Sequence, residues 1–351
     1  MLYAGLDLSR KRLDVCLLDE AGARVEVTAV PPDGDGLRGL AARLALHHQP
    51  VCAAIESMNG ARFVHDLLER EGWQVAVADA QKVKGLAPLA AKTDRIDAFV
   101  LAELARLDLV PAVWLPSPGV RAERERARFR LHLVRHRTAL KNRIHATLIA
   151  HGLSCPVADL FGLRGRELLE CLELPEPWAA TTAASLRLIA DLDREISACE
   201  AELRALGADH PYVPLLRTAP GIGWVLAYTI AAEIGQIERF ATPKKLVGYT
   251  GLCPRVYQSG ASDRRGPLAK NGPEHLRWAL VEAATHAARH PAYAAHHEAT
   301  ARRLGRGRGR KIARIETARK LAEAVWYMLT RNQPFAPAGP ALPLVAETAP
   351  F

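Results

Sequence analysis

The first third of the chain alternates short strand-like runs with helical segments in an order that few folds accommodate. The alternation predicts strands over residues 2–9, 13–19, 24–30, 51–55 and 74–78, and helices over residues 36–47, 61–71 and 94–107. Short turns join the first three strands as hairpins, whereas the helices between the later strands make those strands parallel. The resulting order, β-β-β-α-β-α-β-α, predicts an α/β domain with the ribonuclease H-like arrangement.

Composition narrows the class of protein. The 351 residues are 49% hydrophobic and 24% charged, which is typical of a folded globular chain. No apolar run reaches the roughly 20 residues of a membrane helix, and no basic leader follows Met1. The six cysteines form no C-x-x-C pair, which favours reduced thiols over a zinc ribbon. We therefore expect a cytoplasmic protein that does not enter a membrane.

Positive charge is concentrated in two windows. Residues 121–143 hold nine Lys and Arg against two acids, and residues 302–320 hold nine against Glu316 alone. The first window keeps apolar residues at helical spacing, so it predicts a basic amphipathic helix. One such window is often only a solvated helix face, but two favour a nucleic-acid partner. The predicted phosphate ligands are Arg124, Arg128, Arg135, Lys141, Arg143, Arg306, Arg308 and Arg310, the last three in a flexible Arg-Gly segment.

The rest of the chain is predicted to be mainly helical. Prolines near residue 116 indicate a linker after an α/β domain over 1–115. A heptad seam in the basic helical section over 116–210 packs either against the Arg-rich helix or against a second protomer. A mainly α domain over 211–332 begins with a helix-hairpin-helix-like turn, where Gly221 and Gly223 let backbone N–H groups approach a phosphate. Residues 333–351 are expected to be a disordered tail.

Four acids form a candidate metal site. Asp7 lies within the first predicted strand, Glu56 follows the fourth, and Asp94 and Asp97 lie three residues apart at a helix start. Either helical aspartate alone is explained as a cap or a dipole partner. On a ribonuclease H-like sheet, however, the four carboxylates converge, which requires cations. Oxygen ligands in that number suit Mg²⁺. Asp14, by contrast, is expected to face solvent.

Asp7, Glu56 and the stretch Lys92-Thr93-Asp94-Arg95-Ile96-Asp97-Ala98 resemble the DEDD acids of insertion-sequence transposases of the IS110 type. The N-terminal domain of that family is similar to RuvC, the Holliday-junction resolvase. A second block resembles the family's C-terminal transposase domain, through residues 217–235, 240–254, Gln258-Ser259-Gly260, Gly266, Lys270, Gly272 and Leu276-Arg277. The match covers residues 1 to about 330.

The resemblance implies a recombinase that excises and inserts its own element. A structured non-coding bridge RNA pairs with donor and target DNA, and dimers pair into tetramers. Mg²⁺-binding acids from one protomer act with a serine from another, and that serine corresponds here to Ser259.

From the residues alone, Ser259 is a weak candidate nucleophile, because no adjacent histidine is present to activate it. Ser262 is its rival. The basic residues around Ser259 in the sequence are candidate phosphate ligands, namely Arg255, Arg264, Arg265, Lys270 and Arg277.

The sequence thus predicts a DNA recombinase that forms a phosphoseryl link at Ser259 while Asp7, Glu56, Asp94 and Asp97 hold Mg²⁺. One alternative is a Mg²⁺-dependent junction resolvase or nuclease that uses activated water. A second is a nucleic-acid-binding protein without catalytic activity.

Overall fold

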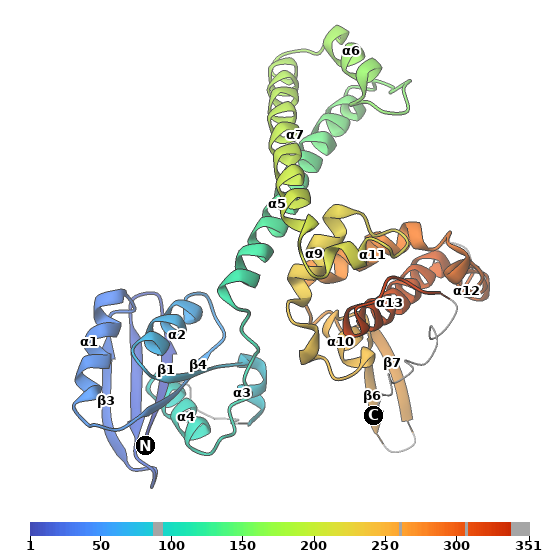
Figure 1. Ribbon diagram of the computed structural model, residues 1–351. Helices are drawn as coiled ribbons and strands as arrows, with labels where there is room; N and C mark the ends of the chain where they lie inside the picture. Colours follow the sequence, from blue (N-terminus) through green and yellow to red (C-terminus); the bar gives the residue numbers. More distant parts are fainter. Residues whose placement is uncertain (87–93, 260–261, 306–307, 338–351) are drawn as a thin grey trace, which may run out of the picture. The chain divides into compact units, whose positions relative to one another are not determined.

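The computed structural model describes residues 1–86, 94–259, 262–305 and 308–337. By its internal contacts the chain divides into two compact units, Met1–Leu115 and Pro116–Phe351 (Figure 1). Among the described residues, no helix is both long and apolar enough to cross a membrane.

The first unit is built on a five-stranded sheet in the order β3-β2-β1-β4-β5. Strands β1, β2 and β3 are antiparallel neighbours, whereas β4 and β5 run parallel to β1. Its elements are β1 (Leu2–Leu8), β2 (Leu13–Leu18), β3 (Arg24–Val30), α1 (Gly34–Ala45), β4 (Val51–Glu56), α2 (Ala61–Arg70), β5 (Gln74–Ala78), α3 (Ala80–Leu86) and α4 (Asp94–Arg106). The predicted strands and helices are confirmed to within about two residues, and the short helix α3 is additional.

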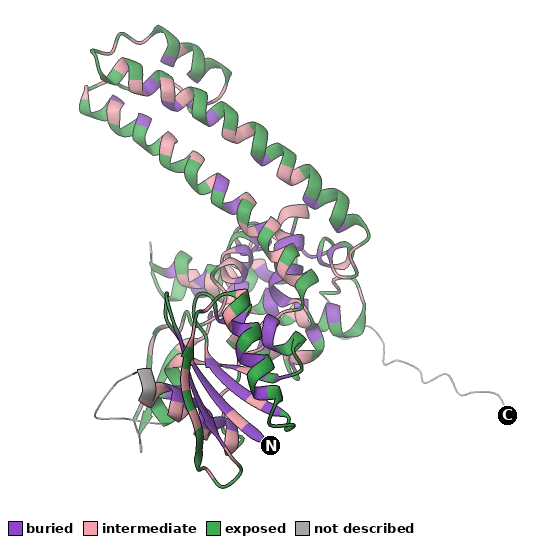
Figure 2. Ribbon diagram, turned by 90° about the vertical axis from the view of Figure 1, so that its left-hand side faces the viewer, coloured by how far each residue is buried: buried purple, intermediate pink, exposed green. Residues whose placement is uncertain are grey.

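Helices cover both faces of this sheet, so its central strands are almost wholly buried (Figure 2). On one face, α1 and α2 contribute leucines and valines to a core with alternate residues of β1, β2, β4 and β5. On the other face lies α4, whose Ala98 and Ala102 pack against Cys16 and Leu18 of β2. Burial on both faces explains why the strands read as apolar runs rather than as alternating patterns.

Gly5 determines how closely α4 approaches the sheet. A Cβ atom added at this residue would lie only 1.8 Å from the backbone oxygen of Ala98 and 2.4 Å from the backbone nitrogen of Ala102. Backbone atoms cannot rotate away as side-chain ends can. The strand and the helix therefore pack backbone to backbone, and only glycine fits at this position.

The second unit begins with a long helical hairpin. It consists of α5 (Pro118–Ala150), α6 (Leu163–Cys171) and α7 (Trp178–Ala208). Ile189, Ile196 and Leu203 of the heptad seam are buried. Salt bridges across the hairpin join Arg126 to Glu202, Arg130 to Glu200 and Arg137 to Asp193. Of the two alternatives for the seam, packing against the Arg-rich helix of the same chain is therefore the one observed.

A helical bundle completes the second unit, and a two-stranded β-hairpin projects from it (Figure 1). Its elements are α8 (Val213–Leu216), α9 (Trp224–Ile234), the 3-10 helix η1 (Ile237–Arg239), α10 (Pro243–Tyr249), β6 (Pro254–Ser259), β7 (Ser262–Leu268), α11 (Glu274–Ala287), α12 (Pro291–Arg303) and α13 (Arg308–Arg331). The apolar helix α9 is the centre of the bundle core, which also takes in α11 and α13.

The close packing at Gly5 generates a stability prediction. Replacing Gly5 by alanine forces α4 away from β1, so we expect the free energy of unfolding to fall by roughly 1–3 kcal/mol, as for other overpacked cores. Urea unfolding of the full chain, followed by circular dichroism, measures the change. Gly39→Ala is the matched control, because Gly39 lies within α1 with nothing within 4 Å of its added Cβ atom. There we expect no loss, or a gain of up to about 1 kcal/mol. Equal effects of the two substitutions would contradict this account of Gly5.

Candidate active site and nucleic-acid surfaces

Asp7 and Glu56 lie at the same edge of the sheet and on the same face. Leu6 of β1 pairs with Ile55 of the parallel strand β4, so Asp7 and Glu56 are the next residues along two adjacent strands. Leu6 and Ile55 belong to the core under α1 and α2. Because strand side chains alternate, Asp7 and Glu56 point to the opposite face, the one covered by α4. Both residues are partly buried.

Helix α4 runs antiparallel to β1 and brings its first turn to this edge. Its Ala98 lies over Gly5, whereas the Arg106 side chain at its other end lies near Gly22, beyond the far end of β1. Asp97 directly precedes Ala98 and therefore lies toward Asp7. Asp94 begins the same helix one turn earlier. The side chain of Asp94, together with Lys92 and Thr93, lies outside the described residues.

Asp14 is a fourth carboxylate on this face, and the expectation that it faces solvent is wrong. It is only 4% exposed and lies directly across from Asp7 in the antiparallel pair of β1 and β2. Its carboxylate accepts a hydrogen bond of 2.6 Å from Arg12. A buried charge needs such a partner. Both faces of β2 pack against other elements, so no side chain of this strand faces solvent.

The donor chemistry of this edge fits a divalent cation. Asp7, Glu56 and Asp97 carry the carboxylate oxygens that hard cations prefer. Among the described residues, no group of three or more histidine, cysteine or acidic side chains is placed so that it could hold a metal ion. Since the Asp94 side chain is not among them, the described part of the edge provides three members of the predicted set.

Ser259 ends strand β6 in an exposed two-stranded hairpin with β7, rather than lying in a loop. Its cross-strand partner is Ser262, and the two residues between them lie outside the described part. Ser259 is exposed, as are all the residues of β6 after Pro254. The pairs below it are Gln258 with Asp263 and Tyr257 with Arg264. A nucleophile here is accessible to a large substrate such as DNA.

Two of the predicted phosphate ligands, Arg124 and Arg128, have other partners in the structure. Arg128 forms a bidentate salt bridge with Glu233, whose side chain is 0% exposed, at 2.7 and 2.9 Å. Arg124 donates to the backbone oxygens of Ala232 and Glu233 at the end of α9. These guanidinium groups neutralise a buried acid and cap a helix. The sequence signal for this role is Glu233 itself, a single acid within an apolar helix.

Other predicted phosphate ligands also have partners within the protein. Arg135 pairs with Glu274, whose pKa it lowers through this bond, and Lys141 lies 4.7 Å from the centre of the Phe161 ring. Arg277 donates to the backbone oxygens of Thr250 and Gly272, so its NH1 atom holds a loop. Arg135 is exposed, as are Arg143, Arg255 and Lys270, and binding of phosphate by these residues stays a prediction.

One of the two glycines of the predicted phosphate-binding turn, Gly221, lies in close contact with a helix. At Gly221, which has a φ of +80°, an added Cβ would lie 2.2 Å from the backbone oxygen of Ala283 in α11. The close approach that requires glycine is therefore to a helix. Gly223 is the N-cap residue of α9 and has open space around it, so its role as a phosphate contact stays a prediction.

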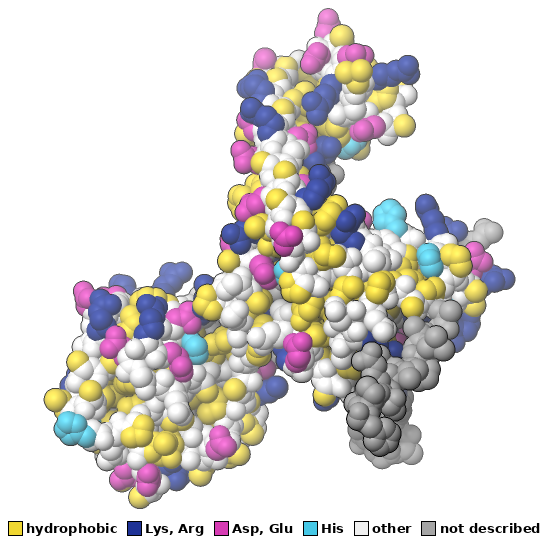
Figure 3. Space-filling view, in the orientation of Figure 1, with side chains coloured by type: hydrophobic (Ala, Val, Ile, Leu, Met, Phe, Trp, Pro, Cys, Tyr) yellow, Lys and Arg dark blue, Asp and Glu magenta, His cyan; other side chains and the backbone are white. Residues whose placement is uncertain are grey.

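The second basic window belongs mostly to a helix. Arg306 lies outside the described residues, whereas Arg308 and Arg310 lie in the first turn of α13 rather than in a flexible segment. Arg308, Arg310, Lys311 and Arg314 are exposed. Lys and Arg side chains gather around α12 and the adjoining end of α13 (Figure 3). This surface, unlike Arg124 and Arg128, is available to a phosphate backbone.

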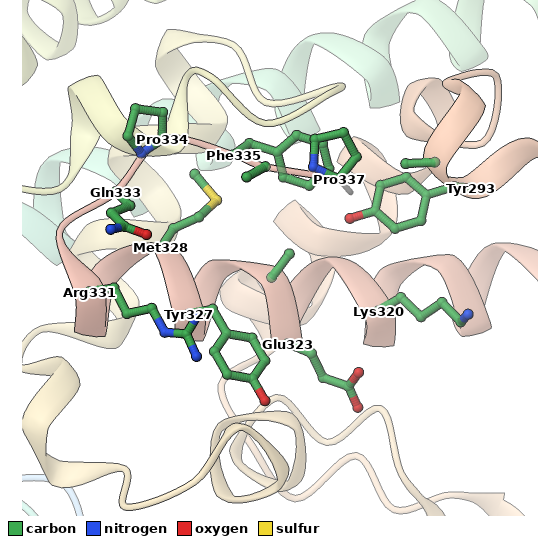
Figure 4. Close-up of a pocket in the computed structure, with 13 residues that line it drawn as sticks. Tyr293, Lys320, Glu323, Tyr327, Met328, Arg331, Gln333, Pro334, Phe335 and Pro337 are labelled. Atoms are coloured by element: carbon green, nitrogen blue, oxygen red, sulfur yellow. The ribbon is translucent and has the colours of Figure 1, made fainter. Parts of the chain in front are cut away.

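A hollow of about 580 Å³ lies between α13 and the segment that follows it (Figure 4). Its lining includes Tyr293, Tyr327 and Phe335. Residues 333–337, predicted to be disordered, form part of this lining: the backbone nitrogen of Phe335 donates to Thr218, and its ring contacts those of His290 and Tyr293. The rest of the predicted tail, residues 338–351, lies outside the described residues. Burial raises the pKa of Tyr293 to about 12. The hollow holds one acid, Glu323, so its lining does not provide the carboxylate set of a metal site.

Comparison with known proteins matches both halves of the chain. A family model described as transposase of the IS116/IS110/IS902 family matches residues 213–299. Another, described as a transposase and named for the DEDD enzymes of the IS110 type, matches residues 4–151. The first spans the Ser259 hairpin, and the second spans the acids.

Individual relatives agree with the family models. The transposase for insertion sequence element IS1328 of Yersinia enterocolitica is 30% identical over 240 residues, which cover 67% of this chain and 70% of the relative. The transposase for element IS1111A of Coxiella burnetii is 24% identical over 348 residues, covering 94% and 90%. A pilin gene-inverting protein of Moraxella bovis is 32% identical over 124 residues, covering 34% and 38%.

The internal role of Arg128 predicts a loss of stability. Arg128→Ala removes the bidentate partner of the buried Glu233 carboxylate, and the next ion pair, with Arg124, is longer at 3.8 Å. We therefore expect the free energy of unfolding to fall by about 3 kcal/mol. Arg126→Ala on the same helix is the control: its salt bridge with Glu202 is exposed, and we expect a change of at most about 1 kcal/mol. Urea unfolding compares the two. Similar losses of stability in Arg128→Ala and Arg126→Ala would contradict the role of Arg128 in neutralising the buried Glu233.

Proposed function

We propose that this chain, which belongs to the IS116/IS110/IS902 family of transposases, cuts and rejoins the DNA of an insertion sequence through a covalent bond to Ser259. Membership of the family makes the chain an enzyme that transposes or recombines DNA. The observation that supports the proposed DNA cleavage is the arrangement of three acids. Asp7 and Glu56 end two paired strands on one face of the sheet, and Asp97 belongs to the first turn of the helix that packs on that face.

We infer a ribonuclease H-like, RuvC-like fold for the first unit. Support comes from the strand order β3-β2-β1-β4-β5, with three antiparallel strands leading into two parallel ones. In open sheets of this kind, ligands bind at the carboxyl ends of the parallel strands. Asp7 and Glu56 stand at those ends of β1 and β4. Within the second unit, Pro116–Phe351, we propose a basic helical section over 116–210 and a transposase domain over 211–332.

The acids are proposed to hold divalent metal, which DEDD transposases usually use. Asp7, Glu56, Asp94 and Asp97 would be the ligands, and Mg²⁺ fits their oxygen chemistry. When bound, the metal supplies positive charge beside the reacting phosphate. The carboxylates of β1 and β4 would hold that charge at the end of two paired strands, and α4, which carries Asp94 and Asp97, packs on the same face of the sheet.

Ser259 is proposed to exchange one ester bond for another. Its Oγ atom forms a bond to phosphorus as the bond from phosphorus to a deoxyribose oxygen breaks; the serine proton passes to solvent and the leaving oxygen takes up a proton. The phosphoseryl link keeps the energy of the broken ester, so a second DNA strand can displace the serine without ATP. Conservation of the ester bond distinguishes a recombinase from a nuclease, which hydrolyses the phosphodiester with water.

The partners we propose are donor DNA, target DNA and a structured bridge RNA. The exposed cations of α12 and α13 suit phosphate backbones, which give affinity without reading sequence. Sequence choice would then come from base pairing. As in the family, we expect dimers that pair into tetramers, with acids and serine from different protomers, acting in the cytoplasm where the DNA is.

The alternative of a junction resolvase or nuclease is tested by trapping the covalent link. With DNA that spans the ends of the element, we expect wild type to form a protein–DNA adduct that resists denaturation, and Ser259→Ala to lose it, because no other group replaces the Oγ atom. Ser262→Ala, which alters the directly opposite residue, should keep the adduct. Free cleaved ends without any adduct would support the nuclease. Loss in Ser262→Ala alone would identify Ser262 as the nucleophile.

The acids are tested separately from the serine. Asp7→Asn and Glu56→Gln remove metal ligands, so we expect adduct formation to fall at least about 100-fold and the rise in melting temperature on adding Mg²⁺ to shrink. Asp35→Asn is the control, because Asp35 is an exposed acid of α1 in the same unit. If wild type forms neither the adduct nor cleaved ends, and Asp7→Asn binds the same DNA as wild type does, the result would instead support a nucleic-acid-binding protein without catalysis.

A further inference from the structure

The register of the β6–β7 hairpin sorts its side chains onto two faces. Directly paired residues share a face, and faces alternate along a strand. Ser259 pairs with Ser262, and two residues further along Tyr257 pairs with Arg264, so these four share one face. Val256 and Arg265 form a pair on the other face.

An independent contact agrees with this assignment. A Cβ atom added at Gly266 would lie 3.2 Å from the ring of Tyr257 and 3.4 Å from the Cβ of Arg255. Gly266 follows Arg264 by two residues, so it belongs to the same face. Arg255 therefore lies on the Ser259 face as well, but at the base of the hairpin, four residues from Ser259.

The five basic residues near Ser259 in the sequence differ in their distance from Ser259, in the face they occupy and in the hydrogen bonds they already form. Arg264 is its diagonal cross-strand neighbour, and such neighbours have Cα atoms about 7–8 Å apart, within reach of a long side chain. Arg265 is directed to the opposite face. Arg277 holds the backbone oxygens of Thr250 and Gly272. Lys270 follows the base of the hairpin, where its backbone bonds to Gly251.

We propose that Arg264 binds the non-bridging oxygens of the phosphodiester that Ser259 attacks. This inference rests on the proposed function of Ser259. As the Oγ–phosphorus bond forms and the ester bond to deoxyribose breaks, negative charge accumulates on those oxygens. A guanidinium group carries a permanent charge and a planar fork of donors that matches two phosphate oxygens. Arg264 thus stabilises the phosphorus centre, and the hairpin presents nucleophile and cation together on one exposed face.

The chain offers a matched pair for the test, because Arg264 and Arg265 are adjacent, both exposed and equal in charge. We expect Arg264→Ala to lower the rate of adduct formation by about 100-fold, the effect of losing one donor to a developing oxyanion. Arg265→Ala should change the rate by less than about threefold, because a change away from the reacting group removes only general attraction to DNA. Binding of the same DNA, followed by fluorescence anisotropy, should weaken equally in both variants. Arg264→Lys should recover part of the rate, since it keeps the charge and loses the fork.

Each outcome bears on a different step. If the adduct requires Ser259 but the two alanine variants react at equal rates, the assignment of Arg264 is overturned while the phosphoserine proposal stands. If Ser259→Ala still forms the adduct, the phosphoserine proposal fails, and with it the role given to Arg264. Melting temperatures of both arginine variants, measured alongside, should match wild type, because both side chains are on the exposed hairpin.

Discussion

Helix α4 lies so close to strand β1 that no side chain fits between them at Gly5. This contact fixes the height of the helix above the sheet, and the rest of the acidic edge depends on it. Asp97 stands one residue before Ala98, whose backbone oxygen lies over Gly5, and Asp7 stands two residues after Gly5 on the same face. A helix held further away by a larger residue would separate the carboxylates of α4 from those of β1 and β4. A packing constraint in the core thus sets the geometry of a charged site.

Charge in the second unit serves two purposes that the sequence does not distinguish. Arginines of α5 neutralise Glu233, cap α9 and link α5 to α7, so much of the first basic window holds the unit together. The cations at the start of α13 have exposed side chains and remain available to a partner. Burial of the partner acid decides whether an arginine is structural or available to a nucleic acid. A guanidinium that pairs with a buried carboxylate cannot move away, because the carboxylate would then be a buried charge without a partner.

The strands and helices of the first unit could be predicted because their signals are local. Short apolar runs, turn residues and helical periodicity place each element within about two residues. The position of Asp7 and Glu56 at one edge then follows from the parallel pairing of β1 with β4. The burial of Asp14 and the pairing of Arg124 with α9 could not be predicted, because they depend on contacts between residues distant in sequence. Asp14 lies on the face of β2 that packs against α4, and the residues of α9 that Arg124 contacts are more than one hundred positions away. The face on which Arg264 lies requires the hairpin register, which the polar sequence around Ser259 does not reveal.

The two halves of the proposed chemistry are each incomplete alone. The carboxylates of the first unit would hold a cation in this proposal, but they offer no nucleophile except water. Ser259 pairs across the hairpin with another serine, Ser262, and a hydroxyl without a base or metal is a weak nucleophile. In the proposed chemistry the carboxylates act through a metal beside the reacting phosphate, and Ser259 supplies the nucleophile. The reaction therefore needs residues from both compact units, Met1–Leu115 and Pro116–Phe351.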